Sequence, residues 1–121
     1  MTAKSPKSIL IVDDDKDFTD SLAALLKDRY RIDVASNGFS AIGKLRKGDF
    51  DLVLLDVVMP GLDGPGFLEE VRKERPGLPV ILMSALADLA GNARRLGIED
   101  FLTKPLDFKK LETRIRRHFD S

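Results

Sequence analysis

Apolar residues gather in short consecutive runs along the chain. Residues 9–12, 52–55 and 80–83 are rich in Val, Ile and Leu, which is typical of strands covered on both faces in a parallel sheet. A weaker run occupies residues 101–102, and apolar residues alternate over 30–35, which predicts a strand nearer an edge. The pattern therefore predicts five strands.

Helical periodicity fills the intervals between these runs. The apolar stripes fall within residues 18–26, 41–45, 67–71 and 108–119. The segment 64–66, Gly-Pro-Gly, predicts that the third helix begins late, and Gly91-Asn92 predicts a short, broken or mobile fourth helix. Five repeats of strand and helix predict an α/β fold, a doubly wound sheet with right-handed crossovers.

Polar residues follow directly after four of the five runs. Asp13 and Asp14 follow the first, Asp56 the third, Ser84 the fourth and Lys104 the fifth. In a doubly wound sheet the carboxyl ends of the strands share one edge, where ligands bind. Each of these residues alone would be ordinary in a loop. Together they predict a site in which an oxygen-ligated dication such as Mg²⁺ compensates the clustered carboxylates.

The composition restricts the class of protein. A chain of 121 residues suits one domain, 1–121, with residues 1–7 as a flexible N-terminal tail. Lys+Arg and Asp+Glu number 20 each, so we expect neither nucleic acid nor a membrane as a direct partner. The chain has no cysteine, no signal peptide and no long apolar run, which together predict a cytoplasmic protein.

Four motifs together resemble the receiver domain of two-component response regulators, the CheY-like superfamily, over essentially the whole chain. They are the acidic pair after the first strand, "LLDVVMPGLDG" around Asp56, Ser84-Ala85, and Lys104-Pro105. The resemblance implies a flavodoxin-like (βα)5 three-layer sandwich with parallel strand order 2-1-3-4-5. It also implies a bacterial phosphoprotein that acts as a switch in a phosphorelay.

The resemblance assigns roles to the acidic residues. Asp56 is expected to accept a phosphoryl group from a histidine kinase or a histidine phosphotransfer protein, forming an aspartyl phosphate. Asp14 is expected to contact Mg²⁺ or Mn²⁺ directly, and Asp13 mainly through coordinated water. Asp56 itself and the backbone carbonyl of Val58 complete the expected metal ligands.

The resemblance also implies how the signal arises. Lys104 and Ser84 are expected to contact the phosphoryl oxygens. Ser84 then moves toward the phosphoryl group and pulls the following loop with it, which leaves space for Phe101 to turn inward. From position alone, a plain core role for Phe101 is as plausible. The output face is expected on the fourth helix, fifth strand and fifth helix. It would serve a downstream protein target or an effector domain of a longer chain, and a homodimer stays open.

Further residues are expected to shape the loops and the phosphoryl lifetime. Pro60 and Gly61 are expected to set the loop after the third strand, and Pro105 resembles the family's cis-proline. Apolar Val58 and Leu86 stand where the family tunes phosphoryl lifetime, so we expect slow self-dephosphorylation. The protein is therefore not an enzyme in the usual sense, because it catalyses only its own phosphoryl transfer and loss.

Other sequence features give weaker signals. Asp15 and Asp17 are expected outside the metal's immediate ligands, as carboxylates near a helix N-terminus. The basic run over 109–117 is typical of a solvated face that could also serve a dimer or an acidic partner. His118, the only histidine, has no partner visible in the sequence and is expected on the surface.

Three rival interpretations fit less well. A calcium loop beginning at Asp13 would need glycine at Phe18 and glutamate at Ala24. A haloacid-dehalogenase-type phosphatase would use Asp13 as its nucleophile, and the residues after it depart from that pattern. A flavodoxin-type binder cradles phosphate after the first strand, where carboxylates would repel it. A scaffold of the same fold that is never phosphorylated also remains open.

Overall fold

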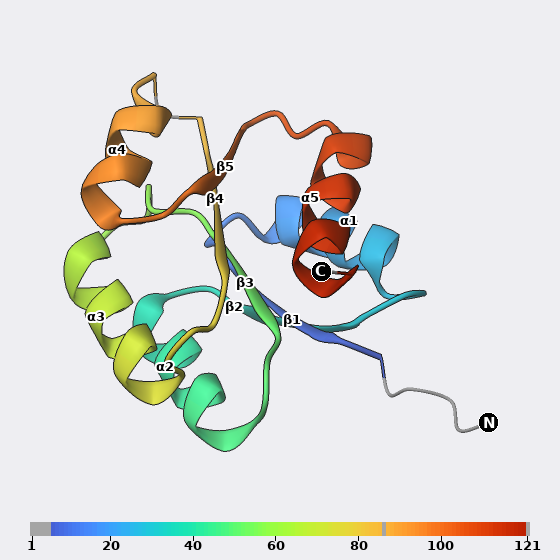
Figure 1. Cartoon of the computed structure of the whole chain (residues 1–121), viewed down its shortest axis with the longest axis horizontal. Coiled ribbons are helices and arrows are strands. Elements are labelled where there is room, and N and C mark those ends of the chain that lie inside the picture. Colours follow the sequence, from blue (N-terminus) through green and yellow to red (C-terminus); the bar gives the residue numbers. More distant parts are fainter. Residues whose placement is uncertain (1–5, 86, 121) are drawn as a thin grey trace.

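The computed structural model describes residues 6–85 and 87–120, and the expected tail lies largely outside them. Strands and helices alternate along the chain (Figure 1). Their bounds are β1 Ser8–Val12, α1 Lys16–Leu26, β2 Arg31–Ala35, α2 Gly38–Lys47, β3 Leu52–Leu55, α3 Gly64–Glu74, β4 Val80–Ser84, α4 Leu89–Leu96, β5 Asp100–Thr103 and α5 Phe108–Asp120. Within the described residues, every helix is too short or too polar to cross a bilayer.

The five strands form one parallel sheet in the order β2-β1-β3-β4-β5, as predicted. The alternating segment that was expected nearer an edge is β2, the edge strand. The three Val/Ile/Leu runs are β1, β3 and β4, in the interior of the sheet. Consecutive apolar positions are required there because each strand is covered on both faces.

Helices cover the two faces of the sheet in separate layers. Leu10 and Val12 of β1 belong to a core shared with α2, α3 and α4. Ile9 and Ile11, which point the other way, belong to a second core shared with α1 and α5. Figure 1 shows α2, α3 and α4 on one side of the strands and α1 and α5 on the other. The result is the predicted three-layer sandwich.

The strand register aligns the carboxyl ends of the strands. Val12 pairs with Leu55 across β1 and β3, so the next residue of each strand, Asp13 and Asp56, emerges at the same level. The backbone N–H of Asp56 donates to the carbonyl of Val12 at 2.9 Å. The N–H of Lys104 donates to the carbonyl of Ser84 at 2.8 Å, which extends the β4–β5 ladder beyond the strands.

The prediction that the third helix begins late is wrong. α3 begins at Gly64, with Asp63 as its N-cap, whose side chain accepts from the N–H of Gly66 at 3.3 Å. Pro65 is tolerated because the first-turn N–H groups have no intrahelical acceptor. A Cβ at Gly66 would lie 2.6 Å from Asp63 Oδ2. The cap by Asp63 thus accompanies a helix that starts at Gly64 despite the low helix propensity of its first residues.

The fourth helix is short, as predicted, but it is capped at both ends. The carboxylate of Asp88 accepts from the N–H of Gly91 at 3.2 Å, and the Asn92 side chain donates to the Asp88 carbonyl at 2.8 Å. Gly97 ends the helix with φ of 71°, a left-handed conformation that favours glycine. Gly91 and Asn92, which disfavour helix by propensity, thus support the start of α4.

Candidate functional site

Four strand ends bring the predicted chemical groups to one edge of the sheet. Asp13 follows β1, Asp56 follows β3, Ser84 ends β4 and Lys104 follows β5. The side chains of Asp13, Asp56 and Ser84 are buried. Polar residues are mostly exposed, and carboxylates are rarely buried unless they are paired. The parallel topology therefore gathers residues that are up to 91 positions apart in the sequence.

Lys104 joins the two buried carboxylates. Its ammonium Nζ lies 2.6 Å from Asp13 Oδ2 and 2.9 Å from Asp56 Oδ2, and 4.0 Å from the centre of the Phe18 ring. Burial alone would lower the pKa of Lys104, but the hydrogen bonds that its ammonium donates to Asp13 and Asp56 outweigh burial and raise that pKa above its ordinary value. The group is therefore a fixed cation at neutral pH.

Backbone N–H groups hold the remaining oxygens of the same carboxylates. Asp13 Oδ1 accepts from the N–H of Asp15 at 3.0 Å, and Asp56 Oδ1 accepts from the N–H of Val58 at 2.8 Å. Each carboxylate is thus tied on one side to its own loop and on the other to Lys104. This orients both carboxylates with little rotational freedom, which favours a preorganised reaction site.

The charges at this edge do not balance. Asp13 and Asp56 share a single ammonium, and Asp14, on the exposed loop beside them, adds a further negative charge. Two buried carboxylates so close to each other are costly unless more positive charge is available. The site is therefore suited to bind a cation in addition to Lys104.

The donor set fits Mg²⁺. Across the described residues, no three Asp, Glu, His or Cys side chains form a ready-made metal cage. Mg²⁺ does not require one, because it keeps several waters and is usually held by one or two carboxylates together with substrate phosphate. The carboxylates of Asp13 and Asp56 are the buried candidates, Asp14 is exposed, and Val58 is half-exposed on the following loop.

The loops around the site have defined geometry. The N–H of Leu62 donates to the carbonyl of Met59 at 3.1 Å, and Gly61 has φ of 74°. With Pro60 second and Gly61 third, these four residues have the features of a type II turn, whose third position requires positive φ. The Lys104–Pro105 peptide bond is cis. The cis bond before Pro105 is the one that the resemblance implied.

Comparisons with known proteins now identify the family. The sequence model of the response regulator receiver domain matches residues 9–116. The chain belongs to this family. Response regulator receiver domains are the phosphorylation-controlled switches of two-component systems, and the predicted relationship is confirmed.

Sequence relatives of this receiver domain are transcriptional regulators. The chain is 44% identical over 107 residues to the transcriptional regulatory protein ZraR of Klebsiella oxytoca, and the match covers 86% of this chain and 24% of that protein. It is 34% identical over 111 residues to TcrA of Mycobacterium tuberculosis, covering 89% and 44%. The chain thus spans only about a quarter of ZraR.

Solved structures share the fold over nearly the whole chain. A CheY-like receiver domain protein from Methanospirillum hungatei gives a TM-score of 0.86 at 30% identity, covering 96% of this chain and 95% of that one. The response regulator TrrA of Thermotoga maritima, solved in complex with Mg²⁺-BeF, gives 0.81 at 31% identity, covering 93% and 98%.

Sequence reasoning missed two features of the receiver domain. Phe18 was placed in the apolar stripe of α1, but its ring also lies beneath the Lys104 ammonium. The direct contact between Lys104 and Asp13 was also not predicted. Helical spacing could show that Phe18 faces the sheet, but only the packing of α1 beside the β5–α5 loop brings it to the lysine.

His118, which was expected on the surface and has no partner visible in the sequence, is only partly exposed and has a partner in Asp100. His118 Nε2 lies 3.1 Å from Asp100 Oδ2, and Arg114 binds the other oxygen of the same carboxylate. The side chains of His118 and Arg114 come from α5, and Asp100 comes from β5. The cluster fastens α5 to the first residue of β5. His118 is thus a half-buried part of the α5–β5 contact.

Phe101 was expected to act in switching, and Leu86 was expected to affect the phosphoryl lifetime. Phe101 is partly buried and packs against the core shared with α2, α3 and α4. Leu86 lies outside the described residues, so its expected role in phosphoryl lifetime stays a prediction.

Asp15 serves as the N-cap of α1, where it accepts from the N–H of Phe18 at 3.1 Å.

Proposed function

We propose that this receiver domain accepts a phosphoryl group on Asp56 from the phosphohistidine of a sensor histidine kinase or a histidine phosphotransfer protein. The observation that carries the proposal is the Lys104 ammonium, which lies in direct contact with the buried carboxylate of Asp56. This pairing supplies a fixed positive charge beside a carboxylate held in one orientation. Phosphoryl transfer depends mainly on such positioning and charge stabilisation.

The transfer step uses an Asp56 carboxylate oxygen as the nucleophile. This oxygen forms a bond to phosphorus while the phosphorus–nitrogen bond of the phosphohistidine breaks. The bonding pair stays on the imidazole, which takes up a proton, and Asp56 becomes an aspartyl phosphate. Lys104 Nζ, 2.9 Å from Asp56 Oδ2, neutralises charge on the transferred oxygens, and the Ser84 hydroxyl donates to one of them.

The metal site lies on the same carboxylates. Asp13, Asp14, Asp56 and the backbone carbonyl of Val58 are the residues that hold Mg²⁺ or Mn²⁺. When bound, the dication neutralises charge on the phosphoryl oxygens. The excess negative charge at this edge supports the assignment, and the Mg²⁺-BeF complex of the Thermotoga maritima relative is a precedent in the family.

Loss of the phosphoryl group is slow in this proposal. Val58 is apolar and 50% exposed beside Asp56, so it offers no hydrogen bond to orient an attacking water. Leu86, also apolar, is assigned the same effect. The receiver domain is thus a switch whose only catalysis is of its own phosphoryl transfer and loss.

Phosphorylation changes partner binding at the output face, which we define as α4, β5 and α5. Phosphorylation draws Ser84 toward Asp56, and Phe101 on β5 turns inward as the adjacent loop moves. Phe101 already packs against residues of the α4 side of the sheet, which supports a coupling between its position and that of α4. The recipient is a downstream protein or an effector domain of a longer chain.

The test is phosphorylation by acetyl phosphate with Mg²⁺, followed by intact-protein and peptide mass spectrometry. We expect one phosphoryl group, located on Asp56, and none on the Asp56→Asn variant or after chelation of Mg²⁺. Transfer from a panel of phosphorylated histidine kinases then identifies the donor. A phosphoryl group on Asp13 instead would contradict the proposal and favour a phosphatase-type site.

The phosphoryl lifetime is measured on the same sample after removal of the donor. We expect decay over many minutes or longer in the presence of Mg²⁺. The matched variant is Val58→Asn, which adds a side-chain amide beside Asp56 and is expected to accelerate decay. Decay within seconds in the unaltered protein would contradict the assignment of slow hydrolysis without affecting that of Asp56.

A further inference from the structure

Phe39, in the first turn of α2, is an apolar side chain that the molecule leaves in solvent. It is 93% exposed, more than any other large hydrophobic side chain within residues 6–85 and 87–120. The next in order are Leu25, at 56%, and Val58, at 50%. Single exposed apolar residues are common on protein surfaces, so what Phe39 can do depends on the surface around it.

An apolar hollow lies beside Phe39, between α2 and α3. Its volume is about 400 Å³, and Ile42, Leu62 and Phe67 line it together with Phe39. Phe39 also lines a second hollow on the β2 side of α2, so its ring projects between two recesses. We call the surface formed by α2, the first half of α3 and Leu62 the α2–α3 face. This face carries both a projecting apolar ring and an apolar recess.

Gly43 leaves open space on the same side of α2. It lies four residues after Phe39 and lines the same two hollows, which places the two residues about 6 Å apart along the helix axis. Apart from neighbouring atoms of its own helix, a Cβ at Gly43 would have no atom within 4 Å. Internal packing therefore does not require glycine here, although glycine disfavours a helix interior. The space above Gly43 is available to an approaching side chain.

α2 and α3 run side by side in the same direction. At the start of α2, a Cβ on Gly38 would lie 3.0 Å from the side chain of Leu62, which comes just before α3. In the last turn of α2, Arg46 contacts Glu74, the last residue of α3, at 2.8 Å. The hollow between the two helices therefore has one end at their first turns and the other at their last turns.

The two ends of the hollow differ in charge. At the first turns, Asp63 is exposed and forms no ion pair within the part of the chain that the structure describes. At the last turns, Arg46 lines the hollow, with Nε bound to Glu74 and Nη2 4.0 Å from Glu70. An arginine has five N–H donors, so Arg46 can bind a further carboxylate. The hollow thus offers a carboxylate at one end and a guanidinium at the other.

We propose that the α2–α3 face binds the same face of a second copy of this chain, with a twofold axis that lies in the contact and crosses α2 at right angles near residue 41. This symmetry reverses the direction of the helices and keeps the two hollows opposite each other. Residue i of one copy then meets residue j of the other, and j meets i. Phe39 of each copy covers Gly43 of the other, and Asp63 of each meets Arg46 of the other.

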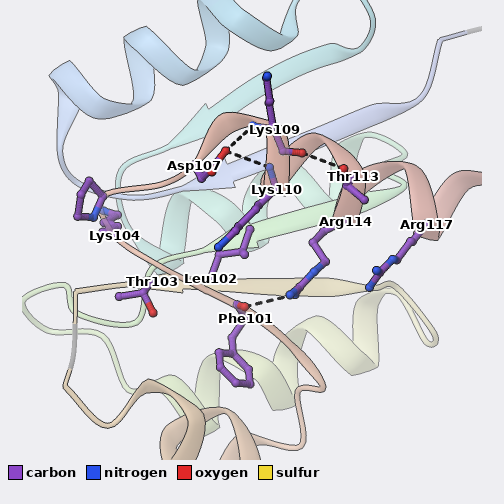
Figure 2. A pocket seen from close by; sticks show the side chains of 11 residues that line it. Phe101, Leu102, Thr103, Lys104, Asp107, Lys109, Lys110, Thr113, Arg114 and Arg117 are labelled. Carbon is purple, nitrogen blue, oxygen red and sulfur yellow. Dashed lines mark hydrogen bonds between the residues drawn. The ribbon is translucent and has the colours of Figure 1, made fainter.

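A second copy fits this face better than a different partner does. Any apolar side chain could enter the hollow, but a second copy also provides, by symmetry, a recess for Phe39 and a charge of opposite sign at each end. The output face is less suited to a symmetric contact. Figure 2 shows cationic side chains of α5 along the groove between α5 and β5, so two copies joined there would set cations against cations. The α2–α3 face shares no element with the output face, so the dimer leaves the output face free.

The test is sedimentation velocity of the full chain from about 10 µM to about 1 mM, without Mg²⁺ or a phosphoryl donor. We expect a monomer–dimer equilibrium in this range, because a contact made by two helices of each copy is smaller than a standard stable interface. In Phe39→Ser the dimer is expected to be weaker by at least about tenfold. The matched control is Leu25→Ser, which removes an exposed apolar side chain of α1 and is expected to dimerise as the unaltered chain does.

Gly43→Gln tests the open space on α2. Glutamine favours helix more than glycine does, and its Cβ would meet no internal atom. Urea denaturation of the dilute monomer is therefore expected to show an unchanged or higher midpoint. The dimer is expected to be several-fold weaker, because the new side chain fills the space that Phe39 of the second copy would occupy. This combination separates a contact between copies from an effect on folding.

Charge reversal tests the twofold arrangement. Arg46→Glu and Asp63→Lys each set like charges against each other at both symmetric contacts, so each variant alone is expected to dimerise more weakly. In an equimolar mixture, a dimer with one copy of each variant has opposite charges at both contacts and is expected to form more strongly. Asp63→Asn keeps an acceptor for the α3 cap, so it separates loss of charge from loss of the cap.

Three results would each overturn the inference. They are an unaltered chain that stays monomeric at about 1 mM, equal dimerisation of Phe39→Ser and Leu25→Ser, and a mixture of the charge-reversal variants that associates no better than its components. The inference does not depend on the proposed function. Phosphorylation of Asp56 by acetyl phosphate, measured on the same variants, tests that function separately and is expected to persist in all of them.

Discussion

Lys104 is the residue on which the acidic edge depends. It holds two buried carboxylates with one ammonium, at 2.6 and 2.9 Å. Its side chain is itself largely buried, and the Phe18 ring covers one side of its ammonium. A single substitution here therefore changes the balance of charge at the whole edge.

Removal of this ammonium should destabilise the fold. In Lys104→Met the side chain keeps a similar length, but Asp13 and Asp56 lose their shared cation. We expect the free energy of unfolding to fall by about 1–3 kcal/mol in metal-free urea denaturation, because buried acceptors are left unpaired. The control is Lys109→Met, an exposed lysine outside any ion pair of the described residues, for which we expect a change within about 0.5 kcal/mol. Equal effects of the two variants would contradict the assigned role.

The pH dependence of this contribution has a definite direction. The pKa of Lys104 in the folded protein lies above its ordinary value of 10.5, because its bonds to Asp13 and Asp56 outweigh the effect of burial. A raised pKa gives stability that is fully present below the ordinary value and is lost as the pH rises through the folded-state pKa. The difference in unfolding free energy between the unaltered protein and Lys104→Met should therefore stay constant from neutral pH to about 10 and shrink above it. A difference that already shrinks between pH 7 and 9 would be inconsistent with this charge state.

At the scale of secondary structure, side-chain caps mark where α3 and α4 begin. α3 and α4 each start after an aspartate whose side chain accepts from a glycine N–H three residues on. A Cβ at Gly66 would lie 2.6 Å from Asp63 Oδ2, and one at Gly91 would lie 2.5 Å from both carboxylate oxygens of Asp88, so a larger residue at either position would require the capping side chain to shift. The same short pattern, Asp-x-x-Gly, therefore starts two helices.

Loss of the α4 cap should loosen that helix alone. In Asp88→Ala, the N–H of Gly91 loses its acceptor, and we expect local opening of α4 to become easier by about 1 kcal/mol. Hydrogen exchange of the α4 amides measures this directly, and the exchange of the strands should be unchanged. Asp28→Ala, at an exposed aspartate beyond the end of α1, is the control. Faster exchange throughout the sheet would show that the cap supports more than α4.

At the scale of the whole molecule, one parallel sheet links Asp56, the proposed phosphoacceptor, to the proposed output face. Asp56 follows β3, Ser84 ends β4, and Phe101 lies on β5. Leu82 of β4 pairs with Phe101, so the ends of these strands are connected by backbone hydrogen bonds. A change at Asp56 can therefore reach β5 through neighbouring strands without any rearrangement of the fold.

Truncation of Phe101 should separate modification from signalling. In Phe101→Ala we expect beryllofluoride and Mg²⁺ to bind at Asp56 as in the unaltered protein, while the accompanying change at α4 becomes smaller. Amide chemical shifts of residues near Asp56 and of α4, recorded with and without beryllofluoride, measure the two effects separately. Leu25→Ala, an exposed leucine of α1 outside the output face, is the control. An α4 response of full size in Phe101→Ala would exclude Phe101 as the coupling residue.

Much of the fold follows from the sequence. The runs at 9–12, 52–55 and 80–83 predicted interior strands because only a strand covered on both faces is apolar at every position. The start of α3 was predicted too late, because propensity penalises Gly64, Pro65 and Gly66 one at a time. In the folded chain the N–H of Gly66 donates to the Asp63 cap, and propensity does not describe that local contact.

The sequence by itself determined which residues stand at the ends of the strands, because the length and spacing of apolar runs are local properties of the chain. Only the tertiary structure decided that Lys104 bridges Asp13 and Asp56 over the ring of Phe18, and that His118 binds Asp100. These contacts join residues 18 to 91 positions apart. They depend on strand order, register and helix packing, which no local pattern specifies.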